Sequence, residues 1–207
     1  MFSLTKVVVF AIAATSVFSA PVAFPVDLDF EARQLGQCPD VAVFFARGTT
    51  EIPNLGTVIG PRFSTALRAA LPGRNIDFSG VPYPAVVSGF LAGGDLGGSI
   101  TMANSVTSIA NRCSNTKIVM SGYSQGAQVT HRAAGRLAAN IQERVVAVVT
   151  FGDPNERRAL PGVLQSRRRT FCATGDLICS GLSLILPPHL TYGVNAPAAA
   201  AFVAGRV

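Results

Sequence analysis

Charged residues and histidine are scarce in this sequence. Only 14% of the 207 residues are charged, whereas 49% are hydrophobic, and tryptophan is absent. A chain of this composition can bury a core and is not disordered. Histidine occurs only at His131 and His189, and the four cysteines show no C-x-x-C spacing, which argues against a zinc site. No internal repeat or low-complexity linker divides the chain, so we expect one folded domain.

Lysine is nearly missing too, yet the chain is basic. Seventeen Lys and Arg residues against eleven Asp and Glu give a formal charge of +6 and a pI near 9.7. Arginines cluster at 157–158 and at 167–169. Such clusters can bind nucleic acid or an acidic polymer, but no nucleic-acid recognition motif accompanies them. A solvated face is therefore the favoured interpretation, and we expect no nucleic-acid partner.

The first residues have the layout of a secretory signal. Lys6 precedes an apolar run over 7–18, and small residues follow it. The run is too short to span a bilayer, so stable membrane insertion is not expected. We predict a signal peptide over 1–20, a pro-segment over 21–33 and a catalytic domain over 34–207. The mature protein is expected to be extracellular.

Secretion changes how the cysteines are interpreted. Cys38, Cys113, Cys172 and Cys179 form an even set, so two disulfides are expected in an oxidising compartment. Four cysteines permit three pairings. Cys172 and Cys179 enclose a short loop and are the natural local pair, which leaves Cys38 with Cys113.

Short apolar runs alternate with segments of helical period. The predicted strands are Val41–Ala46, Ile76–Val81, Lys117–Gly122, Val145–Phe151 and Thr170–Ala173. The predicted helices are Val58–Leu71, Ser99–Asn111, Gln125–Asn140 and a terminal helix within APAAAAFVAGRV. Val-rich runs suit strands that are buried on both faces, and the alternation suits a parallel sheet covered by helices. The pattern predicts a three-layer α/β fold with a central, mainly parallel sheet of five strands.

The stretch GYSQG places Ser124 between Gly122 and Gly126 at the end of the third predicted strand. In a G-x-S-x-G arrangement, the serine occupies a strained turn between a strand and a helix, and its hydroxyl projects from the sheet edge. The pentapeptide can also arise by chance. Its position at the carboxyl end of a strand, where ligands bind in open α/β sheets, favours a nucleophile.

A serine nucleophile needs a base and a carboxylate that orients the base. His131 lies seven residues along the helix that follows Ser124, about 10 Å along its axis, so an exposed or capping role is preferred for it. His189 follows Pro187 and Pro188 in a loop after the last strand and is the predicted base. The chain order Ser, acid, His leaves four candidates for the acid: Glu143, Asp153, Glu156 and Asp176. Asp176 is favoured because it lies inside the loop from Cys172 to Cys179, and Asp153 is its main rival.

Four segments in this order and spacing resemble fungal cutinases, a family of the α/β-hydrolase superfamily: FFARGTTE, GYSQGAQV, CATGDLIC and PPHLTYG. The resemblance runs from about Cys38 to the C-terminus. It implies a serine esterase with Ser124 as nucleophile, His189 as general base and Asp176 as its partner. It also implies the bridges Cys38–Cys113 and Cys172–Cys179, and no metal or organic cofactor.

The resemblance also assigns an oxyanion hole. It implies that the backbone N–H groups of Thr49 and Gln125 are donors, with the Thr49 hydroxyl as a third. Many relatives carry serine in place of Thr49, so this chain keeps the hydroxyl on a stiffer side chain.

Apolar residues near the predicted site suggest the substrate. About half of them are expected to be core, and a substrate rim is predicted from Val86, Val87, Leu184, Ile185 and Leu190. We expect a monomeric enzyme that hydrolyses cutin, a polyester, and short soluble or lipid-like esters. An acetylxylan esterase or related carbohydrate esterase is the first alternative, and a secreted non-catalytic relative is the second.

Overall fold

The computed structural model describes residues 38–207, so the predicted signal peptide and pro-segment lie outside the described residues. The described chain forms a five-stranded sheet in the order β2-β1-β3-β4-β5, and every neighbouring pair is parallel. The strands are β1 (Val41–Ala46), β2 (Ile76–Gly80), β3 (Lys117–Tyr123), β4 (Val145–Phe151) and β5 (Arg168–Phe171). The predicted α/β class and the parallel five-stranded sheet are confirmed.

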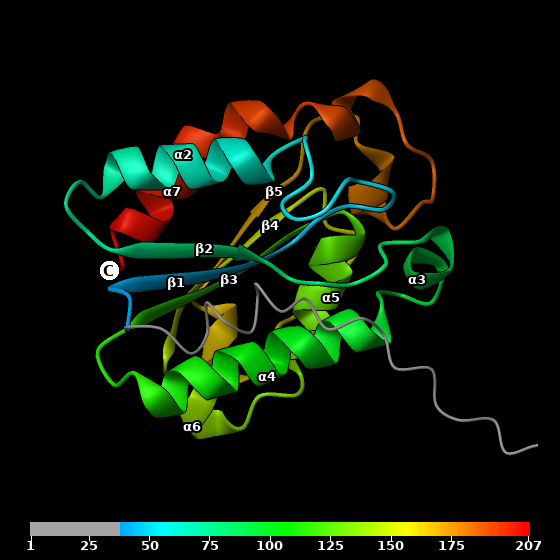
Figure 1. Cartoon of the computed structure of the whole chain (residues 1–207). Coiled ribbons are helices and arrows are strands. Elements are labelled where there is room, and N and C mark those ends of the chain that lie inside the picture. The colour runs from blue at the N-terminus through cyan, green and yellow to red at the C-terminus, as the bar shows by residue number, and fades with distance from the viewer. Residues whose placement is uncertain (1–37) are drawn as a thin grey trace, which may run out of the picture.

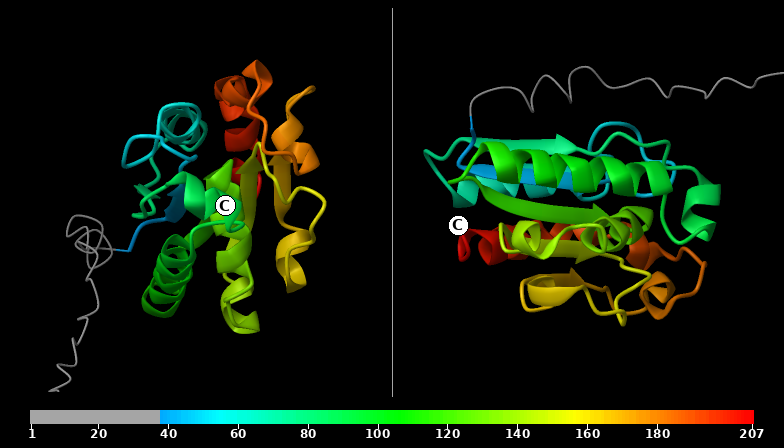
Figure 2. Two further views of the ribbon diagram at one scale, coloured as in Figure 1. Left: turned by 90° about the vertical axis from the view of Figure 1, so that its right-hand side faces the viewer. Right: turned by 90° about the horizontal axis from the view of Figure 1, so that it is seen from below.

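Helices cover both faces of the sheet, as Figure 1 shows. On one face, α2 (Gly60–Ala70) packs beside α7 (Ala196–Ala204). The opposite face carries α4 (Leu96–Arg112), α5 (Gln125–Ala134) and the short α6 (Ala139–Gln142), while α3 (Val87–Leu91) lies at one end of the sheet. The left view in Figure 2 shows the same three layers from the side, and the right view looks from below onto the layer that contains α4.

The strands are apolar on both sides because both sides are covered. In β1, Val41, Val43 and Phe45 belong to the core beneath α2 and α7. Ala42, Phe44 and Ala46 alternate with them and belong to the core beneath α4 and α5. Successive side chains of a strand point to opposite faces, so a Val-rich run with no polar alternation fills two cores at once.

Two helix ends differ from the sequence prediction because a capping residue or a glycine sets them. Helix α4 begins at Leu96, three residues before the predicted start, because the Asp95 carboxylate accepts a hydrogen bond from the Gly98 N–H at 2.6 Å and caps the helix. Helix α5 ends at Ala134, where Gly135 follows, and does not continue to Asn140. Glycine is a poor helix former, and the chain turns before α6 begins.

The last strand is also displaced from its prediction. Strand β5 covers Arg168–Phe171 and pairs in parallel with Val148–Phe151, whereas Thr170–Ala173 was predicted. Its burial is mixed because it is an edge strand with β4 as its sole neighbour in the sheet. An edge strand does not need an apolar run, so the arginines at its start did not signal a strand.

Both expected disulfides are present. Cys38 is bonded to Cys113, which joins the segment before β1 to the end of α4. Cys172 is bonded to Cys179 across the loop that follows β5. Within residues 38–207, no helix combines the length and apolar character needed to cross a membrane.

Candidate active site

Ser124 occupies the turn between β3 and α5. Its backbone has φ 56° and ψ −119°, a conformation that side-chain-bearing residues seldom adopt. A β-carbon on Gly122 would lie 2.1 Å from the Gly126 carbonyl oxygen, and one on Gly126 would lie 1.9 Å from that of Ala46. The two glycines are therefore required by backbone crowding around the turn, as the G-x-S-x-G pattern predicts.

The three predicted catalytic side chains form one hydrogen-bonded chain. His189 Nε2 lies 3.0 Å from Ser124 Oγ, and His189 Nδ1 lies 2.8 Å from Asp176 Oδ2. All three residues are at most 4% exposed. With Asp176 ionised, Nδ1 carries the proton and donates it toward the carboxylate, which leaves the Nε2 lone pair facing the serine hydroxyl.

Asp176 is held by the loop around it. It precedes the short 3-10 helix η2 (Leu177–Ser180), and its Oδ1 accepts a hydrogen bond from the Ile178 N–H at 3.0 Å. The Tyr192 hydroxyl donates to Oδ2, the oxygen that also faces His189. Burial, together with this hydrogen bond, raises the pKa of Tyr192 well above its usual value. The hydroxyl therefore remains a donor and helps to orient the carboxylate.

Two further contacts fix the imidazole and were not predicted. The Tyr123 hydroxyl donates to the carbonyl oxygen of His189 at 2.8 Å. Gly152 has φ 53°, and a β-carbon there would lie 2.7 Å from His189 Cε1. No spacing rule in the sequence identifies either contact, because Tyr123 ends β3 and Gly152 follows β4, both far from His189 along the chain.

Thr49 and Gln125 meet beside Ser124. The Gln125 side-chain amide donates to Thr49 Oγ1 at 3.0 Å and to the Val86 carbonyl oxygen at 2.8 Å. Because the Thr49 oxygen accepts this bond, its own hydroxyl hydrogen is free to donate elsewhere. Among residues 38–207, neither the Thr49 N–H nor the Gln125 N–H donates a hydrogen bond within the protein. The arrangement offers donors for a developing negative charge.

The five predicted rim residues are all exposed. Val86, Val87, Leu184, Ile185 and Leu190 have exposed fractions between 46% and 58%. The expectation that about half of the apolar residues near the site would be core is wrong, since Leu91 is also exposed, at 70%. These loops present an apolar surface to solvent where Val86 borders Gln125 and Leu190 adjoins His189.

The surroundings of His131 differ from those predicted. It is buried, 8% exposed, and its Nε2 lies 2.9 Å from Asp153 Oδ2, so an exposed or capping histidine is wrong. Burial acts to raise the pKa of Asp153. The hydrogen bond and charge of His131 lower it, as do hydrogen bonds from the Asn155 N–H and Thr150. The lowering effects are the larger, so the pKa of Asp153 lies below its usual value. Asp153, the rival candidate for the acid, thus has its own histidine.

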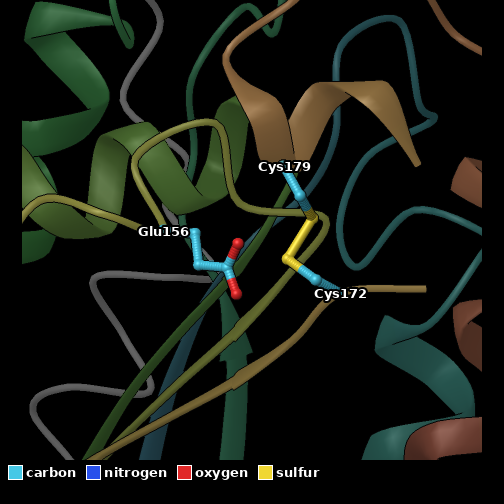
Figure 3. Close-up of side chains that lie close together, drawn as sticks. All are labelled: Glu156, Cys172 and Cys179. Atoms are coloured by element: carbon cyan, nitrogen blue, oxygen red, sulfur yellow. A yellow bond between two sulfur atoms is a disulfide. The ribbon is translucent and has the colours of Figure 1, made fainter. Parts of the chain in front are cut away.

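Three potential metal-ligating residues lie close together, and Figure 3 shows them. Glu156, Cys172 and Cys179 place their ligand atoms within 4.8 Å of one another. The two sulfur atoms are bonded to each other, so they have no thiolate to offer. This cluster is a disulfide with a neighbouring carboxylate and does not form a metal site.

Comparisons with known proteins agree with this geometry. A family model described as Cutinase matches residues 37–207. Cutinase CUT1 of Coprinopsis cinerea is 55% identical over 203 residues, which cover 98% of each chain. A cutinase of Monilinia fructicola is 51% identical over 175 residues, covering 84% of this chain and 85% of its own. The solved structure of a Trichoderma reesei cutinase with a C11Y4 phosphonate inhibitor has a TM-score of 0.78 and 45% identity, covering 81% of this chain and 76% of its own.

Proposed function

Because the chain belongs to the cutinase family and is a serine carboxylic ester hydrolase, we propose that it hydrolyses cutin and short soluble esters through Ser124, His189 and Asp176. The hydrogen-bonded chain from Asp176 through His189 to Ser124 carries the proposal. A strained serine with a histidine at 3.0 Å and an oriented carboxylate behind it is the arrangement that acyl transfer requires.

The reaction has two acyl-transfer steps. Ser124 Oγ attacks the ester carbonyl while His189 Nε2 takes its proton, and the imidazolium then gives that proton to the departing alcohol. Water attacks the resulting acyl-serine ester, again losing a proton to His189, and the carboxylic acid leaves as Oγ regains its proton. Asp176 stays ionised and stabilises the imidazolium in both steps, with the Tyr192 hydroxyl on the same oxygen.

Negative charge on the carbonyl oxygen is stabilised in each step. We assign this to the N–H groups of Thr49 and Gln125 and to the Thr49 hydroxyl. The Gln125 amide supports the assignment, because it donates to the Thr49 oxygen and so leaves the hydroxyl hydrogen available to the substrate. Loss of one such donor typically costs about 3 to 4 kcal/mol of transition-state stabilisation. Threonine in place of serine restricts χ1 and so pre-orients this hydroxyl.

The substrate class follows from the surface around the serine. The exposed rim of Val86, Val87, Leu184, Ile185 and Leu190 is suited to aliphatic chains and to the surface of an insoluble polyester. A carbohydrate ester would gain little from these side chains, since they offer no hydrogen bonds to hydroxyl groups. We therefore place cutin and short aliphatic esters before acetyl-xylan.

Location and processing belong to the same proposal. We propose a signal peptide over 1–20, a pro-segment over 21–33 and a monomeric catalytic domain over 34–207 that acts outside the cell. The two disulfides support an oxidising compartment, and the family match begins at residue 37, after the proposed pro-segment.

The deciding experiment compares the wild type with Ser124→Ala. Rates are measured on p-nitrophenyl esters from acetate to palmitate, with cutin and acetyl-xylan in parallel, after circular dichroism has shown that both proteins are folded. A butyrate-centred profile with release of cutin monomers, abolished in the variant, is expected. Acetate preference with faster xylan deacetylation would move the protein to the carbohydrate esterases, and retained activity in Ser124→Ala would refute the catalytic assignment.

A further inference from the structure

A cavity lies beside the proposed oxyanion loop. Its volume is about 740 Å³, within the range of ligand pockets, and it lies between the loop after β2, residues 53–54 and the start of α4. Its apolar wall is formed by Pro53, Val81, Pro82, Tyr83, Leu96 and Ile100. Figure 1 shows that the chain leaving β2 and the first turn of α4 lie at the same end of the sheet as α3.

The charged groups of the cavity wall are already engaged. Arg47 is 4% exposed, donates to the carbonyl oxygens of Glu51 at 2.8 Å and Tyr83 at 2.7 Å, and stacks over the Tyr83 ring. Asp95 accepts from the Gly98 N–H at 2.6 Å, and the Tyr83 hydroxyl donates to the Arg47 carbonyl oxygen. A polar ligand would have to compete with these bonds, whereas a hydrocarbon chain would not.

The apolar lining of the cavity includes two partly exposed side chains. At the mouth of the cavity, Leu96 is 54% exposed and Ile100 is 41% exposed. Two aliphatic side chains left half in water beside an apolar hollow gain free energy when a ligand covers them.

The cavity lies near the proposed active site along two segments of the chain. Arg47 precedes Thr49 by two residues, and Pro84, which also lines the cavity, precedes Val86 by two residues. Two residues of chain span at most about 7 Å. The Gln125 amide holds both Thr49 and Val86 beside Ser124. Along both segments, residues that line the cavity therefore lie within about 7 Å of residues that flank Ser124.

We propose that this cavity binds an aliphatic segment of a polyester chain while another ester bond of the same chain is at Ser124. The proposal rests on the proposed function and adds a binding site for the polymer beyond the scissile ester. A short soluble ester is too small to occupy both sites. The cavity therefore affects binding and hydrolysis of long chains and leaves hydrolysis of short esters unchanged.

The test replaces the apolar mouth of the cavity by polar side chains. Leu96→Gln and Ile100→Gln are made separately and together, and Val194→Gln, whose side chain is 75% exposed and lies outside the cavity, is the matched control. The measurements are kcat/KM on p-nitrophenyl butyrate and the initial rate on polycaprolactone particles. Binding of the fluorescent fatty acid cis-parinaric acid is titrated separately, with each substitution carried in a Ser124→Ala background.

We expect the double variant to hydrolyse polycaprolactone and to bind cis-parinaric acid about five- to tenfold less well, since each lost methylene contact weakens binding severalfold. Its activity on p-nitrophenyl butyrate stays within about twofold, as does every property of Val194→Gln. Unchanged polymer hydrolysis and unchanged probe binding would overturn the proposal. An equal loss on butyrate would also overturn it, because the substitutions would then act through the catalytic site.

The two proposals fail in different ways. Full activity of Ser124→Ala on p-nitrophenyl butyrate would refute the catalytic assignment, while cis-parinaric acid would still report on the cavity. If Leu96→Gln and Ile100→Gln do not change the affinity for cis-parinaric acid, the cavity proposal is refuted and the catalytic assignment is unaffected.

Discussion

The protein contains two buried His–Asp pairs of nearly equal geometry. His189 and Asp176 are 2.8 Å apart, and His131 and Asp153 are 2.9 Å apart. The first pair continues to Ser124 through the second ring nitrogen of His189, whereas the second ring nitrogen of His131, Nδ1, makes no hydrogen bond to a side chain of residues 38–207. A histidine held by a carboxylate is therefore not a sign of catalysis by itself. What separates the pairs is the strained serine that one of them reaches.

The largest expected difference between the pairs is in activity. His189→Ala should lower kcat/KM on p-nitrophenyl butyrate by about 10⁴-fold or more, because the serine then lacks its base. His131→Ala should change kcat/KM by less than about threefold. It should instead lower the free energy of unfolding by about 3 kcal/mol, because the Asp153 charge remains buried without its partner.

These two variants are compared by steady-state kinetics and by urea denaturation of the same preparations. A loss of activity in His131→Ala that is as large as in His189→Ala, with folding intact, would show that the second pair takes part in the reaction. If both variants lose the same free energy of unfolding, only the difference in kcat/KM distinguishes the roles of the two histidines.

The next effect concerns the space beside the His189 ring. A β-carbon on Gly152 would lie 2.7 Å from His189 Cε1, so Gly152→Ala should displace the imidazole and lower kcat by about 100-fold. Gly73→Ala is the matched control, since Gly73 also has positive φ, 78°, but has no atom within 4 Å of the added carbon. Both substitutions should cost a similar amount of stability from backbone strain. A similar kcat in the two variants would contradict displacement of the ring.

A smaller effect on kcat is expected from the tyrosine that contacts the Asp176 carboxylate. Tyr192→Phe removes the hydroxyl that donates to Asp176 Oδ2, and kcat should fall by about tenfold, the usual worth of a hydrogen bond to a charged group. Tyr123→Phe removes a bond to the backbone carbonyl of His189 and should lower kcat by no more than about threefold. The order of the two variants is the test, and a larger loss in Tyr123→Phe would reverse the roles given to the two rings.

Asp153→Asn is expected to change activity the least and to show the clearest dependence of stability on pH. Its pKa in the folded protein lies below the ordinary value of 3.8, so the folded state favours the ionised form. This contribution to stability is complete above the unfolded pKa and is lost as pH falls from about 4 through the lower folded pKa. Asp153→Asn should therefore be less stable than the wild type at pH 7 by about 2 kcal/mol, and the difference should shrink below pH 4.

Urea denaturation at pH 7, 5 and 3 measures this difference. Asp40→Asn is the control, because Asp40 faces Arg74 at 3.8 Å on the surface, and exposed pairs contribute little. A gap between wild type and Asp153→Asn that is constant from pH 7 to pH 3 would contradict the role of the carboxylate charge.

Local patterns predicted much of this fold. Short, mainly apolar runs predicted β1 to β4 to within one residue at each end, because strands buried on both faces are rich in apolar residues. Edge strand β5 was misplaced by two residues, since its position depends on pairing with β4 and not on its own hydrophobicity. The early end of α5 at Ala134 had a signal in Gly135, which the helical period alone did not reveal.

The site was predictable where motifs carry their own geometry. Ser124 follows from two glycines at fixed offsets, and Asp176 and His189 follow from chain order and loop context. Tyr192, Tyr123 and Gly152 were not identified, although Tyr192 lies three residues after His189. Their roles depend on which side of the imidazole each one reaches, and no spacing along the chain expresses that.

The sequence by itself determined the fold class, the strained serine and the local pair Cys172–Cys179, because each rests on periodicity or on short-range geometry. Only the tertiary structure decided which aspartate faces which histidine. The contacts between 176 and 189 and between 131 and 153 depend on how loops and helices pack over the ends of different strands. Asp153 and Asp176 both follow parallel strands, so loop context favoured Asp176 but left Asp153 as a rival, and packing at the carboxyl edge of the sheet separates the two.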